Sequence, residues 1–296
     1  MGNKPTVPDV AWVSPDEAAR RVREVELKSL LVEFTSHGRQ SPQARSAGSS
    51  PLLTRNRSCQ FGGLLGNVGS MMFWIGSSVG LLVAYLLGST PTGYLAGKLV
   101  RGIDIREHGS KSTGATNVLR TLGKWPALFV LVADVMKGVA AIVFAQSWYP
   151  WLLTRYSVVW PKEFEIPSLV PWLVCLSGLA VLLGHGRSIW LQFTGGKSAA
   201  TGLGVLLAIS LPVGIGTAAV WGVVLAISRI VSFSSILAAL TAIVLVFCFE
   251  HPMPYRLLVV AGGLYVIVRH RANIQRLLAG AEPRLGQNSS GSKLSQ

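Results

Sequence analysis

The stretch WPALFVLVADVMKGVAAIVFAQS, residues 125–147, decides the fold class of this chain. It is apolar over the roughly 20 residues that a helix needs to cross a bilayer. Directly before it stands DIREHGSKSTGATNVLRTLGK, residues 104–124, a junction of glycine, hydroxyl and basic residues. Apolar runs and polar junctions continue to alternate in this way between residues 71 and 268. The sequence therefore predicts an all-α integral membrane protein.

Seven apolar segments are candidates for membrane helices. The two segments on either side of Pro212 are shorter than a usual span, so they either cross separately or form one kinked or re-entrant pair. We expect a seven-transmembrane-helix bundle with short re-entrant or amphipathic polar segments at its cytoplasmic face. The candidate segments are residues 73–100, 125–147, 171–193, 199–211, 213–227, 232–249 and 255–268.

Composition supports a membrane protein and argues against a nucleic-acid-binding one. The chain is 50% hydrophobic and 14% charged, with a mean hydropathy of +0.47. Its formal net charge of +14 would suggest nucleic acid in a soluble protein. Here the basic residues border apolar runs, which is typical of cytoplasmic flanks that meet anionic lipid head groups. The three cysteines have neither metal-ligand nor disulfide-framework spacing.

The chain divides into an extension, a membrane domain and a tail. In residues 1–70, Ser14 and Glu17 are spaced as a capping box and predict an amphipathic helix over residues 14–34. The rest of this extension is rich in Ser, Gly, Arg and Gln, a composition typical of disorder. We expect the extension to be dispensable for catalysis. We expect residues 71–282 to form the membrane domain and residues 283–296 a disordered tail.

Charge predicts which end of the bundle faces the cytoplasm. The junction of residues 101–124 contains five Lys or Arg residues, whereas the loop of residues 149–170 has two, offset by two glutamates. The positive-inside rule therefore places the first junction in the cytoplasm. Counting seven spans puts three further polar clusters on the same face: FTGGKS (193–198), SRIVSFSSI (228–236) and RHRANIQRLL (269–278).

These four clusters have the chemistry of a phosphate site. Glycines expose backbone N–H groups, while lysine, arginine and serine supply charge and hydrogen bonds. A nucleotide P-loop is excluded, because Leu191 stands where the GxxxxGK[ST] pattern requires glycine. His270 and Asn273 lie three residues apart and so share a helix face. The candidate site residues are Ser110, Asn117, Arg120, Gly195, Gly196, Lys197, His270 and Asn273. Ser232, Ser234 and Ser235 either join this site or cap the helix that follows, and we expect Ser234 to be a cap.

Asp134 and Lys137 are charged residues within the apolar segment 125–147. Charges are costly in that environment, and three residues separate this pair on one helix face. We expect the two side chains to pair with each other and to face the interior of the bundle.

Four spaced motifs together resemble the PlsY family of bacterial membrane enzymes, which transfer an acyl group from acyl phosphate to glycerol 3-phosphate. The motifs are GSTPTGYLAGK (88–98), DIREHGSKSTGATNVLR (104–120), GHGRSIWLQFTGGKSAATGLG (184–204) and RHRANIQRLLAGAE (269–282). The resemblance implies a site facing the cytoplasm in the bacterial inner (plasma) membrane. It implies acyl phosphate, glycerol 3-phosphate, membrane lipid and the enzyme that supplies acyl phosphate as partners. The sequence itself has no His, Cys and Asp cluster that suggests a metal, and we expect no cofactor.

The resemblance also implies roles for individual residues. His270, Asn273 and Ser235 correspond to catalytic positions, and Glu282 to a structural one. The substrate-binding positions are Ser110, Asn117, Arg120, Gly195, Gly196 and Lys197. Two motifs depart from the family pattern: GSGN is replaced by GSKS (109–112), and FKGGKG by FTGGKS (193–198), so that a lysine is missing at Thr194.

An acyl phosphate is already activated, so the reaction requires mainly the positioning of two phosphates and a hydroxyl group. Either His270 or a substrate phosphate takes the proton of the glycerol hydroxyl. The rival hypothesis is a membrane transporter of an organic phosphate. Such a transporter is expected to carry its site at the bilayer midplane between inverted repeats. The sequence has no such repeat, and its polar clusters gather at one face.

Overall fold

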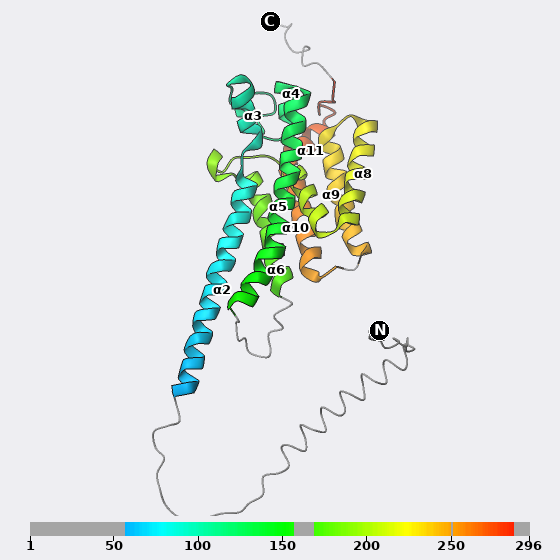
Figure 1. Ribbon diagram of the computed structural model, residues 1–296. Helices are drawn as coiled ribbons and strands as arrows, with labels where there is room; N and C mark the ends of the chain where they lie inside the picture. Colours follow the sequence, from blue (N-terminus) through cyan, green and yellow to red (C-terminus); the bar gives the residue numbers. More distant parts are fainter. Residues whose placement is uncertain (1–56, 157–168, 250, 287–296) are drawn as a thin grey trace, which may run out of the picture. The chain divides into compact units, whose positions relative to one another are not determined.

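The computed structural model describes residues 57–156, 169–249 and 251–286, all of which form helices or the loops between them (Figure 1). The predicted amphipathic helix of residues 14–34 and the tail from residue 287 onward lie outside the described residues. The expected start of the membrane domain at residue 71 falls inside a helix, because α2 (Arg57–Ser89) already begins at Arg57.

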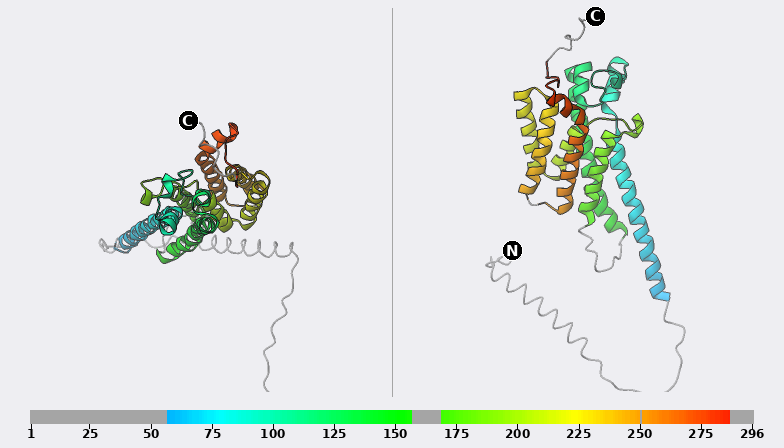
Figure 2. Two further views of the ribbon diagram at one scale, coloured as in Figure 1. Left: turned by 90° about the horizontal axis from the view of Figure 1, so that it is seen from above. Right: turned by 180° about the vertical axis from the view of Figure 1, so that it is seen from behind.

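Two groups of long helices build the bundle (Figure 2). In the first group, α2 packs against α5 (Lys124–Tyr156) and α6 (Leu169–Gly186). Its core is apolar and includes Phe73, Ile142 and Val181, which are completely buried. The second group contains α8 (Leu211–Ser228), α9 (Val231–Cys248) and α10 (Met253–Arg269). Helix α10 packs against α6, and the short α7 (Ala199–Ile209) packs against α5 and α8.

Short helices gather at one end of the bundle, which is drawn at the top of Figure 1. They are α3 (Thr92–Arg101), the 3₁₀ turn η1 (Ile105–Glu107), α4 (Ala115–Leu122) and α11 (Arg271–Leu278). A second 3₁₀ turn, η3 (Ile189–Leu191), follows α6. All of the predicted polar clusters lie in or beside these short segments and the adjoining ends of long helices.

Five helical segments among the described residues are long and apolar enough to cross a membrane. A sixth candidate is α10 taken together with α11, which are bent by 58° at His270. Helix α7 has 11 residues and is therefore about 16 Å long, roughly half of the bilayer core. The five segments are Val68–Arg101, Lys124–Tyr156, Leu169–Gly186, Leu211–Ser228 and Val231–Cys248. An integral membrane protein is thus confirmed, and the count of seven spans stays a prediction.

Two predicted helices are interrupted in the structure. The expected helix of residues 73–100 breaks between Ser89 and Thr92, because Pro91 lacks a backbone N–H and disfavours helical geometry in the residue before it. The expected helix of residues 171–193 ends at Gly186, and the chain then turns through η3. Both interruptions lie next to the polar clusters.

Close backbone crossings hold the first group of helices together. A Cβ atom on Gly88 of α2 would lie 2.2 Å from the carbonyl oxygen of Val181 on α6. A Cβ atom on Gly184 of α6 would lie 2.2 Å from the carbonyl oxygen of Tyr85 on α2. Small residues allow such contacts between membrane helices.

We expect Gly88→Ala to lower the free energy of unfolding by about 1–3 kcal/mol, because the added methyl group forces α2 and α6 apart. The measurement is thermal unfolding of the purified protein in one detergent. The matched control is Gly222→Ala on α8, where an added Cβ meets nothing within 4 Å. Equal melting temperatures for the two variants would contradict the close crossing.

Candidate active site

A cavity of about 390 Å³ opens among the short helices and extends between α5, α7, α8, α9 and α10. This volume is in the range of small-molecule sites. Gly195 and Gly196 do not line it themselves but directly precede Lys197, which does. The predicted residues that line the cavity are Ser110, Asn117, Arg120, Lys197, Ser235, His270 and Asn273. The structure thus brings all four polar clusters together.

Asn117 organises the first polar loop. Its side chain is buried, and its Nδ2 donates hydrogen bonds of 2.8–3.0 Å to the carbonyls of Ile105, His108 and Ser112. Its Oδ1 accepts a hydrogen bond of 2.8 Å from the backbone N–H of Ser110. Because these contacts commit both amide hydrogens, Asn117 shapes the loop rather than donating to a substrate.

Arg120 lies one helical turn after Asn117 and lines the cavity. Its side chain is exposed, and its guanidinium group has no hydrogen bond or ion pair with the described residues. An arginine at a cavity without a carboxylate partner is available to bind an anion in a bidentate manner.

Arg269 fixes the glycine loop, a role that the sequence analysis did not anticipate. Its guanidinium nitrogens donate hydrogen bonds of 2.8–3.2 Å to the carbonyls of Gly195 and Gly196. The N–H of Gly196, which the predicted phosphate chemistry would have aimed at the substrate, instead donates to the carbonyl of His185 at 3.0 Å. Glycine is required at both positions, because an added Cβ would lie 2.0–2.3 Å from His185. The loop thereby presents Lys197 to the cavity.

Lys197 begins a chain of hydrogen bonds along the cavity wall. Its Nζ donates to Oδ1 of Asn273 at 2.6 Å, and Nδ2 of Asn273 donates to Oε1 of Glu282 at 2.6 Å. Glu282 also accepts from Ser232 at 2.8 Å and from Arg276 at 2.7 Å. Burial raises the pKa of the Glu282 carboxyl, but the hydrogen bonds from Asn273, Arg276 and Ser232 lower it by more. The net result is a lowered pKa. The ionised Glu282 therefore anchors Asn273, and through it Lys197.

The electrostatic environment of Lys197 favours an anionic ligand. Burial, together with the nearby Arg276, Arg120 and Arg269, lowers the pKa of its ammonium group to about 8, although Glu282 opposes the shift. Burial and the neighbouring positive charges destabilise the charged ammonium group of Lys197. A bound phosphate dianion would offset this effect and so be stabilised in the site.

His270 stands at the bend between α10 and α11 and is 3% exposed. Its Nδ1 lies 2.7 Å from the carbonyl oxygen of Val266, which only accepts, so Nδ1 carries a hydrogen atom. In the neutral imidazole, Nε2 is then an unprotonated acceptor, and it has no partner among the described residues. This geometry suits a general base.

The serines after α8 have different roles. Ser235 lines the cavity, and its Oγ accepts a hydrogen bond of 3.2 Å from the indole N–H of Trp221, which leaves its own hydroxyl hydrogen free to donate. Ser234 donates only to the carbonyl of Ile230, as expected for a helix-start serine.

The two departures from the family motifs do not add charge to the cavity. Thr194 is exposed and donates to the carbonyl of Leu191 at 2.6 Å. Lys111 is exposed and does not line the cavity. Among the described residues that line it, Arg120 and Lys197 are the lysine or arginine side chains.

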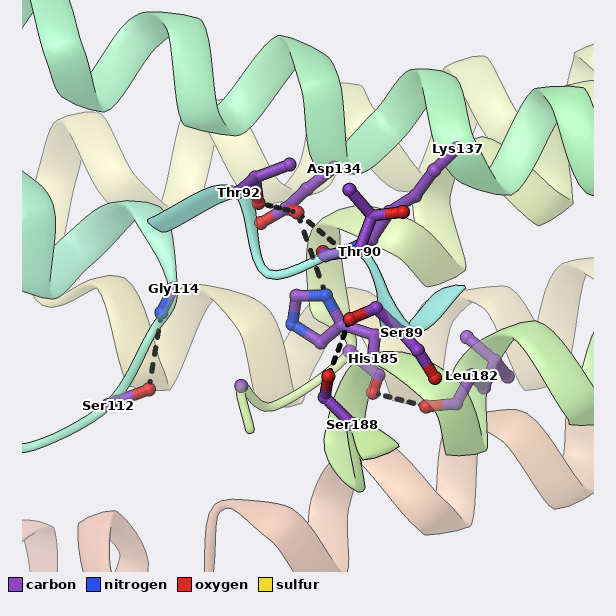
Figure 3. A network of polar contacts seen from close by, with 12 residues as sticks. Ser89, Thr90, Thr92, Ser112, Gly114, Asp134, Lys137, Leu182, His185 and Ser188 are labelled. Atoms are coloured by element: carbon purple, nitrogen blue, oxygen red, sulfur yellow. Dashed lines mark hydrogen bonds and ion pairs between the residues drawn. The ribbon is translucent and has the colours of Figure 1, made fainter. Parts of the chain in front are cut away.

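The predicted pair of Asp134 and Lys137 is confirmed. The carboxylate and the ammonium group are 2.9 Å apart, and both residues are buried. Figure 3 labels the two side chains in their network of polar contacts. Asp134 also borders the cavity.

Fold and site together define a helical membrane protein in which a cavity at one end of the bundle is lined by Arg120, Lys197 and the buried His270. A family model described as glycerol-3-phosphate acyltransferase matches residues 78–280. The chain belongs to this family.

Relatives of known identity agree. The chain is 72% identical over 217 residues to glycerol-3-phosphate acyltransferase 2 of Rhizobium johnstonii, covering 73% of this chain and 99% of that protein. It is 55% identical over 218 residues to a glycerol-3-phosphate acyltransferase of Nostoc sp., covering 73% and 96%. The crystal structure of PlsY in its glycerol 3-phosphate form is similar, with a TM-score of 0.61 and 34% identity, over 71% of this chain and 96% of that one.

Proposed function

We propose that the protein transfers an acyl group from acyl phosphate to the primary hydroxyl of glycerol 3-phosphate. The products are lysophosphatidic acid and inorganic phosphate, and the reaction is the first acylation of phospholipid synthesis. The observation that carries this proposal is one cavity that, among the described residues, is lined by Arg120 and Lys197, by a histidine whose Nε2 has no partner there, and by an apolar interior. PlsY structures are described as glycerol 3-phosphate and lysophosphatidic acid forms, which supports the same substrate and product here.

The cavity matches a substrate with a charged head and an apolar chain. Arg120 and Lys197 lie at its polar part together with Ser110 and Asn273. Further in, the lining is apolar or small and suits the hydrocarbon chain of the acyl donor. Residues of this part include Val135, Leu203, Leu206, Ala239, Ala242 and Val259.

In the proposed step, the glycerol hydroxyl oxygen attacks the carbonyl carbon of acyl phosphate. The bond between that carbon and the phosphate oxygen breaks, and inorganic phosphate leaves with the electron pair. Nε2 of His270 accepts the hydroxyl proton. Arg120 and Lys197 bind the phosphates, and Ser110 and Ser235 donate hydrogen bonds, so that the reactants are held in line and the developing charge is stabilised.

We place the protein in the bacterial plasma membrane with this end of the bundle in the cytoplasm. The cluster of basic residues in the junction before α5 supports this orientation. The proposed topology has seven spans, in which α7 is a short one, and the partner is an enzyme that supplies acyl phosphate.

The decisive experiment offers the purified protein glycerol 3-phosphate with acyl phosphate, acyl-CoA or acylated carrier protein as the donor. We expect lysophosphatidic acid and inorganic phosphate in equal amounts from acyl phosphate alone. Product from another donor would overturn the donor assignment. Saturable flux of glycerol 3-phosphate into liposomes without ester formation would instead identify a transporter.

Activity should fall above about pH 8, because Lys197 loses its positive charge as the pH rises through its pKa of about 8. We expect kcat/KM for glycerol 3-phosphate to decrease there, since this constant reports groups of the free enzyme. The control is Lys197→Arg, which stays charged and should move the decrease to higher pH even if its overall rate is lower. An unchanged profile in Lys197→Arg would exclude Lys197 as the titrating group.

A further inference from the structure

The break between α2 and α3 leaves backbone groups without helical partners inside a membrane segment. Such groups need other hydrogen bonds, because the bilayer offers no water. Ser188 donates its hydroxyl to the carbonyl of Ser89. Lys137 donates to the carbonyl of Thr90 at 3.1 Å. The buried ammonium group therefore stabilises the break.

Asp134 joins the break to α6. Its Oδ1 accepts a hydrogen bond of 2.6 Å from Thr92, the first residue of α3, and lies 2.9 Å from Nζ of Lys137. The same oxygen is 3.6 Å from Nδ1 of His185, near the end of α6. Figure 3 shows the imidazole ring aimed at this carboxylate. This distance is longer than a hydrogen bond, so the ring packs beside the carboxylate without a hydrogen bond to it.

His185 in turn touches the glycine loop from two sides. Its carbonyl accepts the N–H of Gly196 at 3.0 Å. Its Nε2 lies so close to Gly196 that a Cβ atom there would be 2.0 Å away. The next residue is Lys197. A continuous set of contacts therefore leads from the helix break through Asp134 and His185 to the phosphate-binding lysine.

We infer that Asp134 and Lys137 are positioning residues for glycerol 3-phosphate: they hold the α2–α3 break and the His185 ring in the register that presents Lys197 to the phosphate. This inference rests on the proposed function, since it assigns Lys197 to that substrate. Neither Asp134 nor Lys137 needs to contact a reactant. Small displacements of a substrate-binding group lower the reaction rate strongly. A change in Asp134 or Lys137 should therefore have a measurable effect on catalysis.

The test compares Asp134→Asn with Tyr149→Phe. The second variant is a matched control, because Tyr149 of α5 makes a buried hydrogen bond of 2.8 Å to Ser177 of α6 but does not line the cavity. We expect Asp134→Asn to raise the KM for glycerol 3-phosphate by about tenfold or more and the KM for acyl phosphate by less than about twofold. Tyr149→Phe should change neither constant.

Thr92→Val is the second variant, and it tests the positioning role if Asp134→Asn does not fold. It removes one hydroxyl from Asp134 without changing any charge, and we expect an increase in the same KM by about two- to fivefold. If folded variants at Asp134 and Thr92 keep the wild-type KM for glycerol 3-phosphate, the cluster is only structural and the inference is wrong.

Calorimetric binding of glycerol 3-phosphate separates this inference from the proposed reaction. A weaker Kd in Asp134→Asn but not in Tyr149→Phe supports the positioning role, even if the wild-type protein forms no product from acyl phosphate. In that case the proposed donor fails and the inference stands. Equal affinity in both variants overturns the inference, whatever the reaction.

Discussion

Replacing Lys197 by alanine should lower kcat/KM for glycerol 3-phosphate by roughly 30- to 1000-fold. This range corresponds to the loss of one charge-assisted phosphate contact, on the order of 2–4 kcal/mol of transition-state stabilisation. The structural reason is that Lys197 is one of two lysine or arginine side chains that line the described cavity, and its loop is tied by Arg269 and His185. Steady-state kinetics with both substrates varied would measure the effect.

Two controls accompany this variant. Lys111→Ala removes an exposed cation from a polar loop at the same end of the bundle, outside the cavity lining, and should keep near-normal kinetics. Cys175→Ala changes a buried thiol in the bundle core and should alter activity little. Near-normal turnover in Lys197→Ala would show that this residue does not bind the phosphate of the substrate.

The second large effect is expected for His270→Gln, which should lower kcat by on the order of 10²- to 10⁴-fold with a small change in either KM. The side chain is buried at the cavity, and its Nδ1–H is held by Val266, so that Nε2 faces no protein partner among the described residues. Loss of this acceptor removes the group that takes the hydroxyl proton.

The control for this variant is His251→Gln. His251 contacts Ser210 near the start of α8 and does not line the cavity, so its replacement should leave kcat unchanged. A decrease of less than about tenfold in His270→Gln would identify a phosphate oxygen of the substrate as the base, with His270 only orienting the glycerol.

Local chemistry in the sequence was sufficient to find most of the site. Basic residues and histidine in short polar junctions stand out in a largely apolar chain, and they marked Arg120, Lys197 and His270 as candidates. In the structure, these three residues line one cavity. The pairing of Asp134 with Lys137 was also predictable, because it depends on helix periodicity alone. Helix ends were less predictable, since the effect of Pro91 on a long apolar run depends on which groups replace the lost hydrogen bonds.

The sequence by itself determined the membrane class, the polar character of the helix ends and the residue types available to a phosphate. Only the tertiary structure decided which distant groups the polar side chains contact. Asn117 turns inward to shape its loop, Arg269 binds the carbonyls of Gly195 and Gly196, and Lys137 reaches Thr90. The last two contacts join residues 73–74 and 47 positions apart in the chain. Such partners depend on helix crossing and register, which no local pattern of residues encodes.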